Sequence, residues 1–130
     1  WDTHSDQNAG RNNPVQNLDD SLSGFLEDLK RMGRADDVAI MVFSEFGRRV
    51  QENASGGTDH GTAGPMFIMG EKVKGGFYGE HPSLTDLDNG NLKVTTDFRR
   101  VYATMIKEWL GFDDTETILN GDYETFKAFA

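Results

Sequence analysis

Apolar positions recur with helical spacing in two segments of the chain. In residues 17–33 the apolar positions are one, three or four residues apart, which places them on one face of a helix. These positions are Leu18, Leu22, Phe25, Leu26, Leu29 and Met32. The same spacing continues from Phe98 to Leu110, where Thr96 can cap the start and Gly111 can close the end. The pattern predicts two amphipathic helices.

Two short apolar runs, "VAIMVF" at 38–43 and "PMFIMG" at 65–70, lack the alternation of a half-exposed strand. Unbroken apolar runs are typical of strands buried on both faces of a parallel sheet. A helix followed by such a strand is half of a βαβ unit, so the pattern predicts an α/β fold. The other segments read mainly as loops, with a short strand near Phe77, a turn at Asn89-Gly90 and a one-turn helix at 115–119.

Composition limits the partners and the chemistry of the chain. A length of 130 residues fits one domain, and the net charge of −9 repels phosphate backbones and anionic lipid heads. We therefore expect no nucleic-acid partner, and no apolar run approaches the roughly 20 residues that span a membrane. Because the chain has no Cys, any metal site must use His and carboxylate ligands.

Such ligands occur in two motifs, "DTH" at 2–4 and "GTDHG" around His60. In an extended segment Asp2 and His4 project from the same face, so both can reach one cation. Glu45 follows the first apolar run, and sites in open α/β sheets lie at the carboxyl ends of strands. Imidazole with carboxylate suits zinc, manganese or iron(II), whereas magnesium or calcium relies more on oxygen ligands.

Each motif also has a simpler interpretation. "DTH" alone can be a surface turn, and Asp59-His60 among glycines can be a turn of residues that tolerate left-handed backbone. Glu45 can cap the following segment. Taken one at a time, the motifs therefore leave a metal centre and a set of surface turns as competing interpretations.

An arginine pair and a third histidine are further candidates for a role at a site. Arg48 and Arg49 follow Glu45, and an arginine beside a metal can grip phosphate or sulfate by paired hydrogen bonds. The alternative for this pair is a solvated surface. His81 precedes a Pro in a loop, which favours a structural or exposed position.

The segments "WDTH", "VAIMVFSEFGRRVQENASGGTDHG", "VKGGFYGE" and "TTDFRRVYATMIKEWLG" together resemble one family. The chain is similar to the C-terminal part of the bacterial "domain of unknown function 1501" family, a branch of the alkaline phosphatase and sulfatase superfamily. In that family the first motif is internal. We therefore expect residues 1–130 to be a single partial domain whose N-terminal part lies elsewhere in the same protein.

The resemblance implies an α/β/α sandwich with a mainly parallel sheet and metal ligands at its carboxyl edge. The order Asp2, His4 and later His60 matches the superfamily's ligands for one metal. Where an Asp-His pair normally serves a second metal, this chain has Glu45-Phe46, so that His ligand is absent and Asp59 is the residue that can compensate. The superfamily's nucleophile comes from the N-terminal part and is not in these residues.

The function implied by the resemblance is metal-dependent hydrolysis of phosphate or sulfate esters, with Arg48 as a substrate contact. The cofactor is a divalent metal: zinc is favoured, and manganese, magnesium and calcium stay open. The expected substrate is a small anionic ester or a sulfated or phosphorylated glycan, and the expected location is the periplasm or the exterior. The alternative is a non-enzymatic module of the same fold that binds metal or polysaccharide. Expressed alone, these residues are expected to be inactive and to associate.

Overall fold

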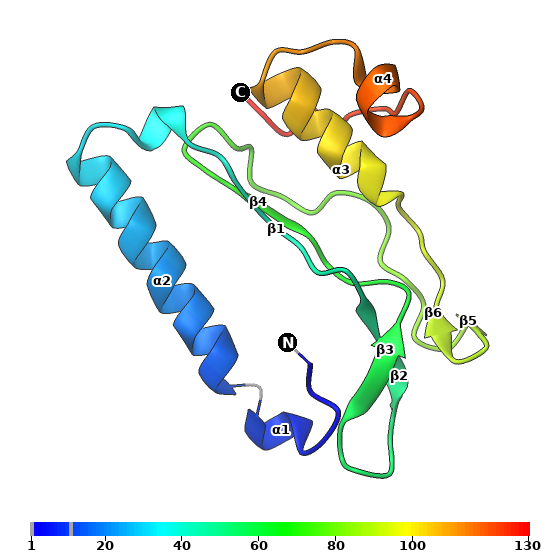
Figure 1. Cartoon of the computed structure of the whole chain (residues 1–130). Coiled ribbons are helices and arrows are strands. Elements are labelled where there is room, and N and C mark those ends of the chain that lie inside the picture. Colours follow the sequence, from blue (N-terminus) through cyan, green and yellow to red (C-terminus); the bar gives the residue numbers. More distant parts are fainter. Residues whose placement is uncertain (1, 11) are drawn as a thin grey trace.

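The computed structural model describes residues 2–10 and 12–130, so Trp1 and Arg11 lie outside the described residues. A long helix stands on one side, paired strands run through the middle, and two helices gather with the C-terminus at one end (Figure 1). In chain order the elements are α1 (Gln7–Gly10), α2 (Asn12–Arg31), η1 (Ala35–Asp37), β1 (Ile40–Val42), β2 (Gly47–Glu52), β3 (Thr58–Gly61), β4 (Phe67–Met69), β5 (Leu87–Asp88), β6 (Asn91–Leu92), α3 (Phe98–Thr104), η2 (Met105–Trp109) and α4 (Thr115–Leu119).

The first predicted helix is α2, which begins at Asn12 and so extends further toward the N-terminus than the apolar pattern indicates. Pro14 is compatible with this earlier start, since a first-turn residue needs no N–H partner within the helix. Gly33 has a φ of 68° just beyond the end, a conformation that glycine adopts without strain. The apolar face is covered only in part: Leu29 is buried, whereas Phe25 is 47% exposed and Met32 is 68% exposed.

The second predicted helix is present as α3, and η2 continues it as one π-helical turn. The predicted cap at Thr96 is wrong, because the side chain of Asp97 accepts the hydrogen bond from the backbone N–H of Arg99 (2.9 Å). Asp97 also pairs with the Arg99 guanidinium, and this hydrogen bond lowers the pKa of the Asp97 carboxyl. Gly111 has a φ of 67° and ends the helical segment as predicted.

The Asp97 cap gives a test of what begins α3. We expect Asp97→Ala to lower the free energy of unfolding by about 1 kcal/mol, because a backbone N–H loses its acceptor. Asp97→Asn keeps the cap oxygen and loses the ion pair, so its loss is expected to be smaller. Urea unfolding followed by circular dichroism measures both. Equal losses for the two variants would assign the effect to the ion pair with Arg99 instead of the cap.

The prediction of an α/β/α sandwich with a mainly parallel sheet is wrong. The strands form three separate two-stranded sheets, β1 with β4, β2 with β3 and β5 with β6, and every pair is antiparallel. The two apolar runs do pair with each other, with Met41 opposite Ile68. However, the chain between them turns back as the β2–β3 hairpin, which delivers β4 in the direction opposite to β1. A parallel pair needs a crossover connection, usually a helix, and no helix lies between β1 and β4 in the described chain.

The segment between β4 and α3 contains one hairpin, β5–β6, around the predicted turn at Asn89-Gly90. Both turn residues have positive φ, 48° and 82°, as two-residue hairpin turns of this kind require. The predicted strand near Phe77 is not formed. Instead Val73 makes an isolated antiparallel bridge with Phe129, which ties this segment to the C-terminal tail.

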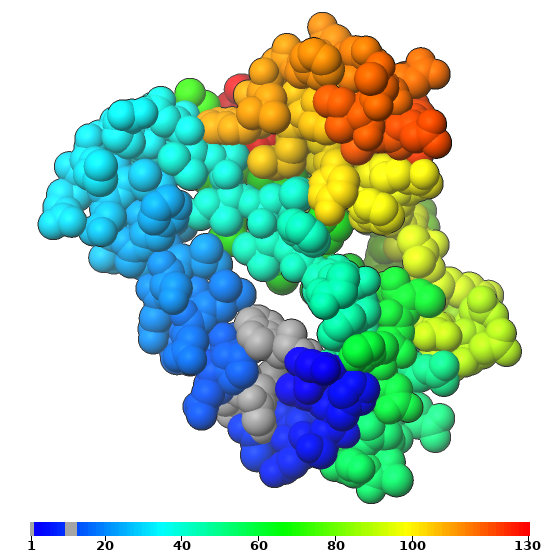
Figure 2. All heavy atoms as spheres, in the orientation of Figure 1, coloured from blue at the N-terminus to red at the C-terminus, as the bar shows by residue number. Residues whose placement is uncertain are grey.

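The most buried residues lie in α2, in α3, at the start of α4 and in the C-terminal tail. They are Leu29, Ala103, Thr104, Thr115, Ala128 and Phe129. An opening separates the N-terminal half of α2 from the strands in the space-filling view (Figure 2), in keeping with the partly exposed apolar face of the helix. As expected from the sequence, none of the helices in the described ranges is both long enough and apolar enough to cross a bilayer.

Candidate metal centre

The N-terminal segment lies along the β2–β3 hairpin and is held there by backbone hydrogen bonds. Ser5 makes an antiparallel bridge with Gly56, and the N–H of Asp6 donates to the carbonyl of Ser55 (3.0 Å). Nearer the site, the N–H of Thr58 donates to the carbonyl of Thr3 (3.3 Å). This pairing brings the "DTH" motif beside β3, although the two are far apart in the sequence.

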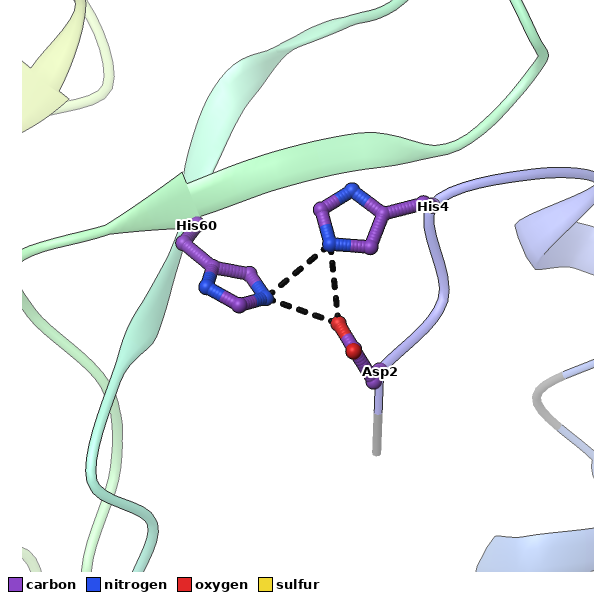
Figure 3. Close-up of side chains that lie close together, drawn as sticks. All are labelled: Asp2, His4 and His60. Carbon is purple, nitrogen blue, oxygen red and sulfur yellow. Dashed lines mark hydrogen bonds and ion pairs between the residues drawn. The ribbon is translucent and has the colours of Figure 1, made fainter.

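Three side chains converge where the segment meets β3 (Figure 3). Asp2 Oδ1 lies 2.7 Å from His60 Nε2 and 2.9 Å from His4 Nε2, and the two Nε2 atoms are 3.0 Å apart. The side chains are 62%, 44% and 48% exposed for Asp2, His60 and His4 respectively. The cluster is therefore open to solvent on at least one side and accessible to a ligand.

The three contacts cannot all be hydrogen bonds at once. Each Nε2 carries at most one proton, and two N–H groups pointing at Asp2 leave the Nε2–Nε2 contact without a donor and acceptor. A cation placed among the three atoms would replace these close contacts with a favourable interaction between the cation and each atom. Ligands of a tetrahedral zinc, about 2.0–2.1 Å from the metal, are about 3.3 Å apart, slightly more than the separations here. The cluster therefore fits a small divalent cation after a modest expansion.

Two imidazoles and one carboxylate also form a set of ligands of the kind found in catalytic metal sites. Catalytic zinc sites use three protein ligands and leave the fourth position to water or substrate, and the same three donors suit non-haem iron. Asp2, His4 and His60 would hold the ion. The exposed side of the cluster would supply the open position.

A glycine allows the N-terminal segment to approach this closely. A Cβ at Gly57 would lie 2.3 Å from the carbonyl carbon of His4, far inside contact distance. Gly57 is itself buried. The glycine-rich part of the "GGTDHG" stretch thus allows close backbone packing next to His4.

Arg48 lies opposite His60 in the β2–β3 register and turns toward the cluster. Its Nη2 is 3.3 Å from Asp2 Oδ1, and its Nη1 donates to the carbonyl of Thr58 (2.8 Å). The side chain is only 20% exposed. The structure thus places Arg48 against the carboxylate of Asp2, and a contact of Arg48 with a substrate stays a prediction.

The environment of Asp2 favours its ionised form. The pKa of Asp2 is lowered, first by the hydrogen bond with His60 and then by the charges of His4 and Arg48, which outweigh desolvation. A metal ligand must be deprotonated, so this direction suits metal binding. Phe46 adds a packing contact, with its ring stacked on His60 at a centroid distance of 3.7 Å.

The other predicted site residues lie outside the three-atom cluster. Asp59 Oδ1 is 3.8 Å from His4 Nδ1, on the side of the ring away from Asp2, within ion-pair distance but too far for a hydrogen bond. Glu45 is exposed and accepts a hydrogen bond from the Ser44 hydroxyl (3.3 Å). The structure does not bring Glu45 to the cluster, because β1 ends at Val42 and the chain turns before β2 begins.

Two contributors were not identified from the sequence. Phe46 stands directly after Glu45 in "SEFGR", and only the hairpin register places its ring on His60. Asn53 lies in a polar loop without periodicity, so no pattern distinguished it from its neighbours. His81 is exposed, with Nδ1 2.9 Å from the carbonyl of Pro82, in agreement with the structural or exposed position expected for it.

Fold and site together define a class of protein: an assembly of helices and short antiparallel hairpins that presents an Asp-His-His cluster of metal-ligand type at its surface. The family can also be stated. The chain belongs to the family described as "Protein of unknown function (DUF1501)", whose model matches residues 1–127, and this confirms the membership expected from the motifs. No curated protein and no solved structure matches the chain.

Proposed function

We propose that this chain supplies the metal ligands of a hydrolase that acts on phosphate or sulfate esters. The observation that carries the proposal is the convergence of Asp2, His4 and His60 on one point, with separations of 2.7–3.0 Å. When bound, a divalent cation in such a site polarises an ester oxygen and lowers the pKa of a nucleophile. Zinc is the first choice because two of the three donors are imidazoles.

The chain's own residues have distinct tasks in this proposal. Asp2, His4 and His60 bind the cation, and Asp59 orients the imidazole of His4. Arg48 holds the Asp2 carboxylate in place. The order of the three ligands along the chain resembles that of the alkaline phosphatase and sulfatase superfamily, which supports an anionic ester as the substrate class.

The second candidate is a non-catalytic metal-binding module. The observation that favours it is the position of Glu45-Phe46: the Glu45 carboxylate stays out of the cluster and the Phe46 ring packs on His60. A ring in that place adds no ligand for a second metal. Many phosphatases use two metals that stabilise the attacking and the leaving oxygen, and a one-metal site lacks half of that arrangement.

Metal titration tests whether the protein binds a metal at all. We expect metal-stripped protein to bind one equivalent of zinc in calorimetry, and elemental analysis after dialysis to retain close to one equivalent. Aryl phosphate and aryl sulfate assays of the zinc-loaded full-length protein then distinguish the two candidates. Stoichiometric zinc without turnover would favour the non-catalytic module. A folded protein that binds no zinc, manganese, magnesium or calcium would overturn both.

A further inference from the structure

The side chain of Asn53, just beyond β2, makes every hydrogen bond that an amide can make. Its Oδ1 accepts from the backbone N–H groups of Ser55 and Gly57, both at 3.0 Å. Its Nδ2 donates to the carbonyl of His4 (2.9 Å) and to Asp59 Oδ1 (3.2 Å). Both N–H donors of Nδ2 and two acceptor positions of Oδ1 thus form hydrogen bonds.

The two ends of this amide serve different parts of the molecule. The oxygen end shapes the turn between β2 and β3, together with the backbone bond from the N–H of Asn53 to the carbonyl of Gly57 (2.8 Å). The nitrogen end crosses to the N-terminal segment and holds a ligand residue, His4, by its backbone. The same side chain therefore fixes the turn and sets where the segment lies against it.

The bond to Asp59 adds a second link to the same histidine. Asn53 holds the Asp59 carboxylate, whose Oδ1 lies 3.8 Å from His4 Nδ1, within ion-pair distance but too far for a hydrogen bond. Asn53 thus contacts the His4 backbone directly and also holds the carboxylate beside the His4 ring.

We propose that Asn53 is the positioning residue of the metal centre: it fixes the location of His4 through the His4 carbonyl, and it holds the Asp59 carboxylate beside the His4 ring. The proposal rests on the metal site proposed above. It adds a residue that touches neither the cation nor a substrate and that acts through two other residues.

Asn53→Asp tests the proposal because it changes one end of the side chain only. The variant keeps an oxygen for the N–H groups of Ser55 and Gly57, and it replaces the donor NH₂ by an oxygen that repels Asp59 and the His4 carbonyl. We expect zinc affinity in calorimetry to fall roughly 10- to 100-fold, the loss typical of an outer-shell partner. An added negative charge by itself would strengthen cation binding, so charge alone cannot produce this loss.

Asn120→Asp is the matched control. Asn120 is exposed at the end of α4, and it shares the chemical change and the added charge without a contact to the cluster. We expect its zinc affinity to stay within twofold of the unchanged protein. Zinc affinity of Asn53→Asp within the same twofold range would overturn the proposal.

Nitrogen-15 NMR of the metal-free protein gives a readout that does not depend on zinc. In Asn53→Asp we expect residues 2–6 to gain picosecond-to-nanosecond motion, because the segment loses its hydrogen bond at the His4 carbonyl. Asp59→Asn, which leaves that hydrogen bond intact, should not loosen the segment. If the unchanged protein binds none of zinc, manganese, magnesium and calcium, the proposed function fails. The role of Asn53 in placing the segment is then decided by these spectra, and unchanged motion of residues 2–6 would overturn it.

Discussion

His60→Ala is expected to abolish stoichiometric zinc binding. Loss of an outer-shell partner alone typically costs roughly 10- to 100-fold in metal affinity, so loss of a ligand atom should cost at least about 100-fold. His60 supplies the one ligand that comes from β3, and without it the other two belong to a single short segment. Calorimetry of metal-stripped protein measures the change.

His81→Ala is the control for this experiment, because His81 is an exposed histidine whose ring lies beside the carbonyl of Pro82 and not at the cluster. We expect its zinc affinity to equal that of the unchanged protein. Circular dichroism should show that both variants remain folded, since His60 contributes mainly a ring stacked on Phe46. Equal affinities for the two variants would show that His60 is not a ligand.

Glu108→Ala is expected to lower the free energy of unfolding by about 2–3 kcal/mol, because it leaves backbone N–H groups of the C-terminal tail without acceptors. The Glu108 carboxylate accepts from the N–H of Lys127 (2.8 Å) and of Phe129 (3.1 Å), and Phe129 is among the most buried residues. The bond from the N–H of Phe126 to the Thr104 hydroxyl (3.0 Å) holds the same tail to α3. Urea unfolding measures the loss. Glu27→Ala, on the exposed side of α2, should change stability by less than about 0.5 kcal/mol.

The charge of Glu108 also makes this contribution depend on pH. Burial raises the pKa of Glu108, but hydrogen bonds from Thr125, Phe129 and Lys127 outweigh it, and the net pKa is lowered from 4.5. A lowered folded-state pKa means that the stabilisation is complete above the unfolded value and is lost as pH falls through the folded value. The stability difference between the unchanged protein and Glu108→Gln should therefore be constant near pH 7 and shrink below about pH 4.5. A difference that stays constant down to pH 3 would contradict this origin.

The helices could be predicted from the sequence because their apolar spacing is local. Both predicted helices occur, although α2 begins at Asn12, earlier than the apolar pattern indicates, and α3 is capped by Asp97 instead of Thr96. Strand direction could not be predicted in the same way. An unbroken apolar run such as "VAIMVF" fits a strand covered on both faces, but direction depends on the connection, and here a polar hairpin with no apolar signature reverses the chain.

The candidate site could likewise be predicted from the sequence only in part. Asp2 and His4 could be paired from their two-residue spacing, whereas His60 entered through its motif and the family resemblance. The contacts around them depend on the β2–β3 register, which sets Arg48 against Asp2 and Phe46 on His60. Asn53 lies outside any residue pattern, because its role comes from crossing between two segments that only the fold brings together.

Because part of the apolar face of α2 is exposed, the protein should bury less apolar surface on folding than a compact domain of its length. The chain exposes 9010 Å² of surface, where a compact monomer of this mass exposes about 6,900 Å². Since less apolar surface is newly exposed on unfolding, the heat-capacity increment and the urea m-value should both fall below those usual for 130 residues. Amide hydrogens in the N-terminal half of α2 should exchange through local opening, well before those of α3. The N-terminal half of the long helix is thus expected to open independently of α3.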